Sequence, residues 1–416
     1  MTRRRRALAA TLAFLIGGVA TASTAVAAPP SIDSVLADDC ARGTFAYSPE
    51  PPPALLALQT NLAWKYATGL NVIVAVVDSG IDASNEHLRD AVIGGVNLVD
   101  DGENASGLSD LDGHGTAIAG EIAARQISDS GVVGLAPRAM LLSVRIFRGR
   151  DPQTIDAGFG PTSERLVAGI RYAVDHGASI INVSLSEYTE SSALLDVVNY
   201  ATSRGSLIIA SAGNVKTTEN TSNTPRYPAG YPGVIGVAAV DSLGLVQDSI
   251  SGPHVSVAAP GTNVLTSATG AGDCIYSTDE ASTSYATGYV SGAAALVAEA
   301  HPDETPAQWK YRLEATAVRV NLDERTDAAG WGIIQPRDAI VLVPSASTRG
   351  PESPFTDTAG SAVSTTDVVV TATPSHSALG LTREVMMYVL IAAISVLGVL
   401  GVLIVLRRIR RAARVD

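Results

Sequence analysis

Short apolar runs alternate with amphipathic stretches through the middle of the chain. The runs contain few polar residues until their last positions, a pattern typical of strands buried on both faces of a sheet. The stretches between them place apolar residues at helical spacing, and several end at a glycine. The predicted strands are residues 71–78, 140–146, 179–185, 207–211 and 234–240, and the predicted helices are residues 55–69, 163–176 and 191–203. Strands that alternate with helices of this length predict an α/β fold, with a mainly parallel sheet flanked by helices.

Another predicted helix, which runs to Ala298, consists almost entirely of small residues. A hydroxyl-rich turn leads into it, and its low side-chain bulk lets it lie deep in a core. The amides and the positive dipole end of its first turn favour negative charge beside a hydroxyl there. Ser284 is therefore a candidate nucleophile. The alternative is that Ser282, Thr283 and Ser284 only cap the helix.

Both ends of the chain carry apolar segments outside this pattern. Four arginines, a short apolar run and small residues up to Ala27 predict that residues 1–27 are a secretory signal peptide; a short membrane anchor is the alternative. Residues 385–406 carry no charge and are long enough to span about 30 Å of hydrocarbon as one transmembrane helix. Residues 407–416 contain five arginines, so the positive-inside rule predicts a cytoplasmic tail and an extracytoplasmic body.

The formal net charge of −12 understates how acidic the exported part is. Removing the nine arginines and the aspartate of the two ends brings the charge to −20. Such a surface repels nucleic acid and anionic lipid, so we expect no nucleic-acid partner. With 46% hydrophobic residues, the chain of 416 residues can bury a large core in one domain or in two smaller ones.

Shifts in composition divide the exported part of the chain into three segments. Residues 28–54 are polar and contain a run of three prolines, which predicts an N-terminal extension. Residues 55–343 hold the predicted strands and helices and form the predicted domain. Residues 344–384 are rich in Ser, Thr and Pro and predict a linker to the membrane, with an ordered subdomain around residues 368–370 as the alternative.

The chain has two cysteines, Cys40 and Cys274. Because exported proteins meet an oxidising compartment, we expect them to form a disulfide. Two cysteines without clustered histidines do not make a zinc site. Acidic residues gather between positions 100 and 112, but their spacing fits no known calcium loop. We interpret them as a solvated loop, and we predict no metal and no cofactor. The acidic residues concerned are Asp100, Asp101, Glu103, Asp110 and Asp112.

Three further segments carry groups that complement Ser284. The first strand ends in Asp78, a charge that must be paired after so apolar a run. His114 lies between glycines at the start of a second small-residue helix, and Asn214 follows the strand at residues 207–211. In parallel sheets, functional groups gather at the carboxyl ends of the strands. Each residue alone also fits a structural role, but together they supply an acid, a base, a nucleophile and an oxyanion donor.

The motifs around these residues resemble those of the subtilisin-like serine proteases. They are Asp78-Ser-Gly, His114-Gly-Thr-Ala-Ile-Ala-Gly, Ser211-Ala-Gly-Asn214 and Thr283-Ser284-Tyr-Ala, in that order. The signal peptide, extension, linker, single C-terminal span and basic tail narrow the resemblance to the mycosins, the membrane-anchored subtilases of actinobacterial type VII secretion systems. The resemblance implies a subtilisin-like three-layer domain and an Asp-His-Ser serine endopeptidase.

The resemblance also implies a role for each site residue. Asp78 orients His114, which acts first as general base and then as general acid. Ser284 attacks the scissile carbonyl, and Asn214 with the Ser284 amide forms the oxyanion hole. The segment that matches the strand pairing with the substrate backbone consists of Ser184, Leu185 and Ser186.

Three positions depart from the family's pattern. Ser282 replaces a glycine, so its side chain would clash if the turn required a positive φ. Gly288 replaces a proline in the first turns of the helix, which removes rigidity but no chemical group. Ser186 replaces a glycine of the substrate-pairing strand and would narrow the cleft.

Three functions are compatible with these observations. The leading interpretation is a membrane-anchored, extracytoplasmic serine endopeptidase that cleaves selected exported proteins and associates with the type VII secretion membrane complex. The second is a catalytically weak or inactive subtilase that mainly stabilises this complex, favoured by Ser282 and opposed by the intact set of motifs. The third is an unrelated surface-anchored binding protein, for which four ordered motifs would be a coincidence.

Overall fold

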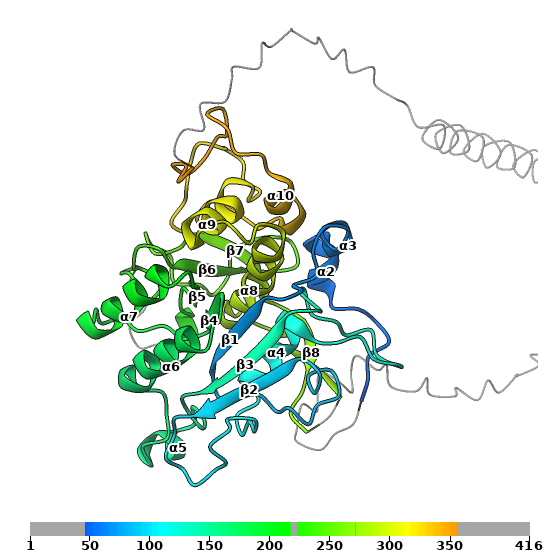
Figure 1. Cartoon of the computed structure of the whole chain (residues 1–416), viewed down its shortest axis with the longest axis vertical. Coiled ribbons are helices and arrows are strands. Elements are labelled where there is room, and N and C mark those ends of the chain that lie inside the picture. Colours follow the sequence, from blue (N-terminus) through cyan, green and yellow to red (C-terminus); the bar gives the residue numbers. More distant parts are fainter. Residues whose placement is uncertain (1–45, 218–222, 271, 356–416) are drawn as a thin grey trace, which may run out of the picture. The chain divides into compact units, whose positions relative to one another are not determined.

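A seven-stranded sheet, in which all neighbouring strands pair in parallel, forms the centre of the described part of the chain (Figure 1). The computed structural model describes residues 46–217, 223–270 and 272–355. The strand order is β2-β3-β1-β4-β5-β6-β7. The strands are β1 (Ile73–Asp78), β2 (Val92–Asn97), β3 (Met140–Arg145), β4 (Ile180–Val183), β5 (Leu207–Ser211), β6 (Ile235–Val240) and β7 (Val257–Pro260). The predicted α/β fold with a mainly parallel sheet is confirmed.

Side chains alternate between the two faces of the sheet, and each face has its own hydrophobic core. Val74 and Val76 of β1 belong to the cluster that includes α4 (His114–Ala123) and α8 (Thr283–Ala300). Ala75 and Val77 belong to the cluster that includes α6 (Ser163–Asp175) and α7 (Ser192–Ser203). Because the residues of the inner strands β1, β3, β4 and β5 are buried on both faces, these strands appear in the sequence as continuous apolar runs.

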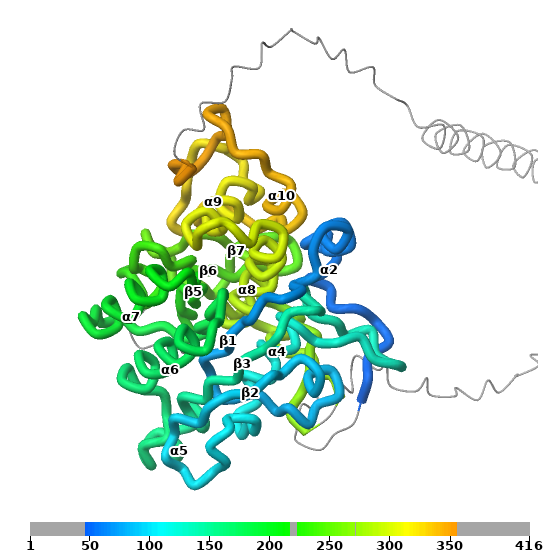
Figure 2. The backbone as a smooth tube through the Cα atoms, in the orientation of Figure 1, coloured from blue at the N-terminus to red at the C-terminus, as the bar shows by residue number. Residues whose placement is uncertain are grey.

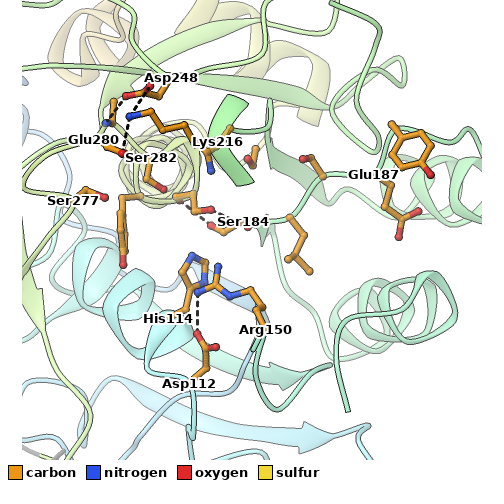
Figure 3. A pocket seen from close by; sticks show the side chains of 18 of the residues that line it. Asp112, His114, Arg150, Ser184, Glu187, Lys216, Asp248, Ser277, Glu280 and Ser282 are labelled. Carbon is orange, nitrogen blue, oxygen red and sulfur yellow. Dashed lines mark hydrogen bonds and ion pairs between the residues drawn. The ribbon is translucent and has the colours of Figure 1, made fainter. Parts of the chain in front are cut away.

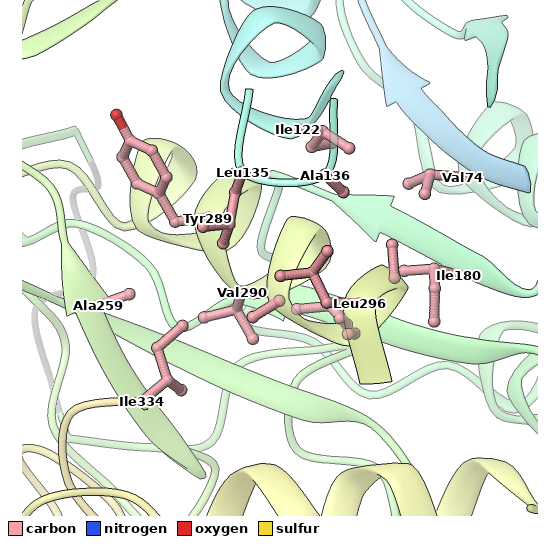
Figure 4. Packing of buried hydrophobic residues seen from close by; sticks show 14 of the residues in the cluster. Val74, Ile122, Leu135, Ala136, Ile180, Ala259, Tyr289, Val290, Leu296 and Ile334 are labelled. Atoms are coloured by element: carbon pink, nitrogen blue, oxygen red, sulfur yellow. The ribbon is translucent and has the colours of Figure 1, made fainter. Parts of the chain in front are cut away.

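Helix α8 is buried along nearly its whole length. Its residues up to Ala298 are all buried, and it packs across β4, β5, β6 and β7. Small side chains permit this close packing: a Cβ added at Gly292 would lie 2.8 Å from the Cβ of Leu135. Figure 4 shows Val290 and Leu296 of α8 within this core. The sequence-based prediction of a deeply placed small-residue helix is therefore correct.

The remaining elements surround this centre. Helices α9 (Pro306–Ala315) and α10 (Pro336–Val341) follow α8 and pack against it, and α10 also contacts α3 near the start of the described chain (Figure 2). An antiparallel hairpin of β8 (Val264–Ser267) and β9 (Asp273–Tyr276) lies beside α4. The short helices are α2 (Pro53–Ala57), α3 (Thr60–Ala63), α5 (Pro152–Asp156) and the 3-10 turn η1 (Val215–Thr217).

The structure differs from the predicted elements in several respects: β7, the β8–β9 hairpin and α9 were not predicted, and two further differences have a clear physical reason. The single helix predicted for residues 55–69 is wrong, because Gln59 adopts a left-handed φ of 50° and separates α2 from α3. Strand β2 was not predicted, because its two glycines resemble a turn. A Cβ at Gly95 would overlap the carbonyl oxygen of Ser143, so β2 requires glycine in order to lie this close to β3.

Several predicted segments lie outside the described residues: the signal peptide, most of the N-terminal extension, the larger part of the linker, residues 385–406 and the basic tail. Between residues 46 and 355, leaving aside the two gaps, no helix is long and apolar enough to cross a membrane. The described residues after position 343 contact the domain. The ring of Phe355 lies 5.7 Å from that of Tyr311, between ring centroids, and beside the guanidinium of Arg312.

Candidate active site

The carboxyl ends of the central strands and the first turns of two helices border one cleft. Asp78 is the last residue of β1, and Ser184 directly follows β4. His114 begins α4, and Ser284 lies in the first turn of α8. His114, Ser184, Asn214 and Ser284 all line this cleft (Figure 3). The fold therefore brings together groups that lie up to about 200 residues apart in the chain.

Asp78 and His114 form a buried hydrogen-bonded pair. The Nδ1 atom of His114 donates to Oδ1 of Asp78 over 2.8 Å, and the Ser79 amide donates to the same oxygen. Burial alone would raise the pKa of Asp78. The charge and hydrogen bond of His114 and the positive field of Arg150 outweigh it, so the pKa of this carboxyl lies below its usual range. An ionised Asp78 fixes the tautomer in which Nε2 of His114 can accept a proton.

A second aspartate holds the turn that presents His114. Asp110 accepts hydrogen bonds from the amides of Asp112, Gly113 and Thr116 and from the hydroxyl of Thr116. Its side chain is buried, and that burial raises its pKa. The interpretation of Asp110 as part of a solvated loop is therefore wrong. Its buried carboxylate accepts hydrogen bonds from amides at the start of α4 that have no partner within the helix.

Asp101, from the same acidic stretch, is also structural. Its side chain is fully buried and forms an ion pair of 2.7 Å with Arg145. Burial raises the pKa of Asp101, but the hydrogen bonds from Arg145 and Asn97 outweigh this effect and lower it to about 2. The solvated-loop interpretation is wrong for this residue too.

Ser282, which replaces the family's glycine in the turn before Ser284, adopts an unstrained backbone conformation. Ser282 has a φ of −118°, so the position does not require glycine, and the expected clash is absent. The Ser282 side chain makes no capping hydrogen bond to α8. The hydroxyl of Thr283 contacts Ser211 and Asn214 instead of capping the helix. The alternative that these hydroxyls serve only as helix caps therefore has no support from the geometry.

Ser284 is hydrogen-bonded to the extended segment that directly follows β4, residues 184–186. Its hydroxyl donates to the carbonyl oxygen of Ser184 over 3.2 Å, and the Ser184 hydroxyl donates to the carbonyl oxygen of Ser284 over 2.9 Å. Asn182 donates to the Ser184 hydroxyl and accepts from Ser291, which extends the network along α8. Within the described residues, no hydrogen bond joins Ser284 to His114. Hydrogen bonds between catalytic groups are often completed only when substrate binds.

Asn214 is oriented by the residue that precedes Ser284. Its Oδ1 atom accepts from both the amide and the hydroxyl of Thr283, at 2.8 and 3.0 Å. With the oxygen committed to Thr283, the Nδ2 group is the donor that this side chain offers. The Asn214 amide and the first turn of α8 are thus held next to each other, as an oxyanion hole requires.

The predicted substrate-pairing strand forms one wall of the cleft. Ser184, Leu185 and Ser186 all line it. The Oγ atom of Ser186 lies 2.9 Å from the position that a Cβ on Gly213 would occupy. The hydroxyl of Ser186 therefore lies close to the backbone of Gly213, and the narrowing of the cleft stays a prediction.

The sequence did not indicate two ion pairs at the rim of the cleft. Arg150 donates to Asp112 over 2.9 Å on the His114 side. Lys216 lies 2.6 Å from Glu280 and 3.8 Å from Asp248. The Arg150 pair joins loops 38 residues apart, and no local motif marks such a pairing.

Gly288 has a structural partner behind the site. A Cβ at this position would overlap Oε2 of Glu121, whose side chain is buried and makes no hydrogen bond within the described residues. Burial raises the pKa of Glu121 well above its usual range. Gly288, which replaces the family's proline, thus leaves the space that the buried carboxyl of Glu121 on α4 occupies.

A further grouping of histidine, aspartate and serine anchors the chain's described N-terminal end. Asp273 lies 2.9 Å from Nε2 of His87, accepts from the Ser130 hydroxyl over 2.7 Å, and accepts from the Ser48 amide over 2.9 Å. The hydroxyl faces the carboxylate and not the imidazole, so Ser130 has no base beside it. Cys274 is buried next to this anchor. Its predicted partner Cys40 lies outside the described residues, so the disulfide stays a prediction.

This fold and site correspond to a known family. Residues 69–332 match the Subtilase family (Peptidase_S8), and the chain belongs to that family. Subtilases are serine endopeptidases. Family membership excludes the interpretation of the chain as an unrelated surface-anchored binding protein.

Individual relatives narrow the comparison. The chain is 34% identical to fervidolysin of Fervidobacterium pennivorans over 66% of this chain and 41% of the relative. It is 39% identical to subtilisin E of Bacillus subtilis (strain 168) over 60% of this chain and 61% of the relative. It therefore spans less than two thirds of either relative's length.

Solved structures of mycosins superpose on the chain. The structure of MycP1 with its N-terminal propeptide removed matches with a TM-score of 0.61 and 30% identity, over 71% of this chain and 100% of that chain. The MycP3 protease from the type VII (ESX-3) secretion system matches with a TM-score of 0.60 and 29% identity, over 76% of this chain and 100% of that one.

Proposed function

We propose that the chain is a membrane-anchored, extracytoplasmic serine endopeptidase of the mycosin type that cleaves selected exported proteins. The observation that carries this proposal is the buried Asp78–His114 hydrogen bond at the edge of a cleft that also holds Ser284 and Asn214. The similarity to MycP1 and MycP3 supports an association with a type VII secretion system.

In this proposal the reaction begins when a peptide pairs with the backbone of the strand after β4. His114 removes the proton from Ser284 as the hydroxyl attacks the scissile carbonyl, and Asp78 stabilises the imidazolium that forms. The tetrahedral oxyanion accepts hydrogen bonds from Asn214 and from the Ser284 amide. A donor of this kind contributes about 10²–10³ in turnover.

The acyl-enzyme then forms and breaks down. His114 gives its proton to the leaving amine, which departs with the carboxyl-terminal part of the substrate. Water enters, His114 removes its proton, and the ester to Ser284 is hydrolysed by the same sequence of proton transfers. No group other than these side chains is required for the acid–base steps.

The proposal also assigns a role to each segment at the two ends of the chain. Residues 1–27 act as signal peptide, residues 28–54 as extension and residues 344–384 as linker. Residues 385–406 form the anchor in the cytoplasmic membrane and residues 407–416 the cytoplasmic tail. Protein or peptide substrates and the secretion membrane complex are the partners.

A fluorophosphonate probe tests the proposed chemistry on the full-length protein in membranes. Such probes react with a serine only where a base and an oxyanion hole activate it. We expect labelling of the wild-type protein and none of the Ser284→Ala variant. A correctly folded wild-type protein that resists labelling would favour the second candidate function, a catalytically inactive subtilase that serves as a structural component of the complex.

The natural substrates are identified by a second experiment. Mass spectrometry of culture supernatants from wild-type and Ser284→Ala cells should reveal exported proteins with fragments present only in the wild type. Identical fragment patterns would contradict the proposed processing role.

A further inference from the structure

The cleft contains one carboxylate that lacks a cationic partner. Glu187 lines the cleft three residues beyond Ser184 (Figure 3). The other three carboxylates of the cleft each lie beside an arginine or lysine. In the part of the chain that the structure describes, no arginine or lysine lies within ion-pair distance of Glu187. Its negative charge is therefore available to a bound substrate.

The position of Glu187 is fixed. Its backbone amide and carbonyl pair with those of Tyr227, both at 2.8 Å. The hydroxyl of Ser163, at the start of α6, lies 2.8 Å from both carboxylate oxygens and donates to them. Burial raises the pKa of Glu187, and the negative charge of Glu164 adds to that effect. An ion pair with a cation of the substrate would offset both the desolvation of the Glu187 carboxylate and its repulsion by Glu164.

Distance along the strand relates Glu187 to the reacting bond. The Ser184 carbonyl oxygen lies 3.2 Å from the Ser284 hydroxyl, so the scissile bond lies beside Ser184. A strand advances about 3.3 Å per residue, so Glu187 is about 10 Å further along. An extended peptide paired with this strand places a side chain three to four residues from the scissile bond beside Glu187.

In the proposed reaction this part of the peptide is the acyl half. The acyl-enzyme intermediate must stay in register until water attacks it, after the leaving half has gone. Backbone pairing with the segment from Ser184 to Ser186 would hold the acyl half throughout both steps.

We propose that Glu187 selects a lysine or arginine at the third or fourth acyl-side residue from the scissile bond. This inference rests on the proposed peptidase function and adds a substrate preference to it. The ammonium or guanidinium group forms an ion pair with Glu187, next to the Ser163 hydroxyl. Ile155 and Leu185 also line the cleft and offer apolar surface to the methylene groups of the same side chain.

Matched peptides test the preference on the full-length protein in detergent. Internally quenched peptides carry lysine, glutamine or glutamate at one position at a time, on both sides of the scissile bond. We expect kcat/KM to favour lysine over glutamate by about tenfold at one of the two acyl-side positions. The Glu187→Gln variant should reduce this ratio to below about twofold, and Glu187→Lys should reverse it.

The controls separate a local charge effect from general damage. Glu190→Gln removes an exposed carboxylate that does not line the cleft, and it should retain the lysine preference. Each ratio is measured within one preparation, so the fraction of active protein cancels. In the wild type, higher salt should lower the ratio without any substitution, because ion pairs of this exposure are screened.

Three outcomes overturn the inference. They are a wild type without lysine preference at either acyl-side position, a preference that persists in Glu187→Gln, and a preference that is insensitive to salt. Failure of the proposed function is distinguishable, since a wild type that cleaves no peptide and resists the fluorophosphonate probe has no peptidase activity to direct.

Discussion

Ser184 and Ser284 exchange two hydrogen bonds, each hydroxyl donating to the other residue's carbonyl oxygen. The hydroxyl of Ser284, the proposed nucleophile, therefore occupies the backbone acceptor that a paired substrate amide would use. We expect substrate binding to compete for this acceptor and so to release the Ser284 hydroxyl toward His114. The pair also ties the substrate-binding strand to the helix that carries the nucleophile, so neither can shift alone.

Ser184→Ala tests the structural half of this relationship. The substitution leaves the buried Asn182 amide without its hydroxyl acceptor and removes the hydroxyl that donates to the Ser284 carbonyl, so we expect unfolding free energy to fall by about 1–3 kcal/mol. Urea unfolding measures it. Ser203→Ala, which removes an exposed hydroxyl on α7, should change stability by less than about 0.5 kcal/mol. Equal effects of the two substitutions would contradict the coupling.

Asp78→Asn tests the role of the buried carboxylate. An asparagine can hold the wrong tautomer of His114, so we expect turnover to fall by about 10⁴-fold with little change in KM. Because the pKa of Asp78 is lowered in the folded state, its ionised form stabilises the fold above the unfolded pKa of about 4, and this stability is lost as pH falls through the folded value.

Melting temperature against pH measures the second effect. In the Ser284→Ala background, which prevents self-cleavage, Asp78→Asn should lose less stability between pH 5 and strong acid than the parent. Parallel pH curves for the two proteins would show that Asp78 contributes nothing to acid sensitivity.

Ser186→Gly tests the narrow cleft. The Ser186 hydroxyl occupies space opposite Gly213, so its removal should raise kcat/KM for peptides with a large residue before the scissile bond by roughly tenfold. Peptides with alanine at that position should change far less. An equal gain for both peptides would indicate a general change in activity and not a change in space.

Glu121→Gln tests the buried carboxyl behind the site. In the folded state its raised pKa keeps Glu121 neutral, whereas the unfolded chain ionises it above about pH 4.3. Wild-type stability should therefore decrease as pH rises above that value, until the folded pKa is reached. We expect Glu121→Gln to be more stable than wild type at pH 8 and similar near pH 4. A stability difference between Glu121→Gln and wild type that does not change with pH would exclude ionisation of Glu121 as its cause.

Local patterns were sufficient to predict five of the buried strands and α8, because burial on two faces and the need for small side chains leave a direct imprint on composition; the four-residue strand β7 was missed. The break at Gln59 and strand β2 were missed, since the first depends on one left-handed residue and the second on two glycines that resemble a turn. For the site, the motifs singled out Asp78, His114 and Ser284. In the structure His114 and Ser284 line one cleft and Asp78 is hydrogen-bonded to His114, whereas their catalytic roles stay a prediction.

The relationships that the sequence did not reveal are pairings between distant segments. Arg150 and Asp112 are distant in the sequence and form an ion pair only in the folded chain. Gly288 is explained by its contact with the buried side chain of Glu121, which leaves no room for a Cβ. Asp110 was interpreted as solvated because its acidic neighbours suggested a loop surface. Only the fold directs its carboxylate onto the amides that begin α4.

The anchor at Asp273 limits where the mature chain can begin. Its carboxylate is shared among Ser48, Ser130 and His87, and the Ala46 carbonyl accepts from the Asp273 amide. Trimming ahead of Ala46 leaves every one of these bonds intact, whereas trimming past Ser48 removes the bonds at Ala46 and Ser48 and leaves the Asp273 carboxylate with Ser130 and His87 alone. We therefore expect the last part of the N-terminal extension to stay with the domain as part of its packing.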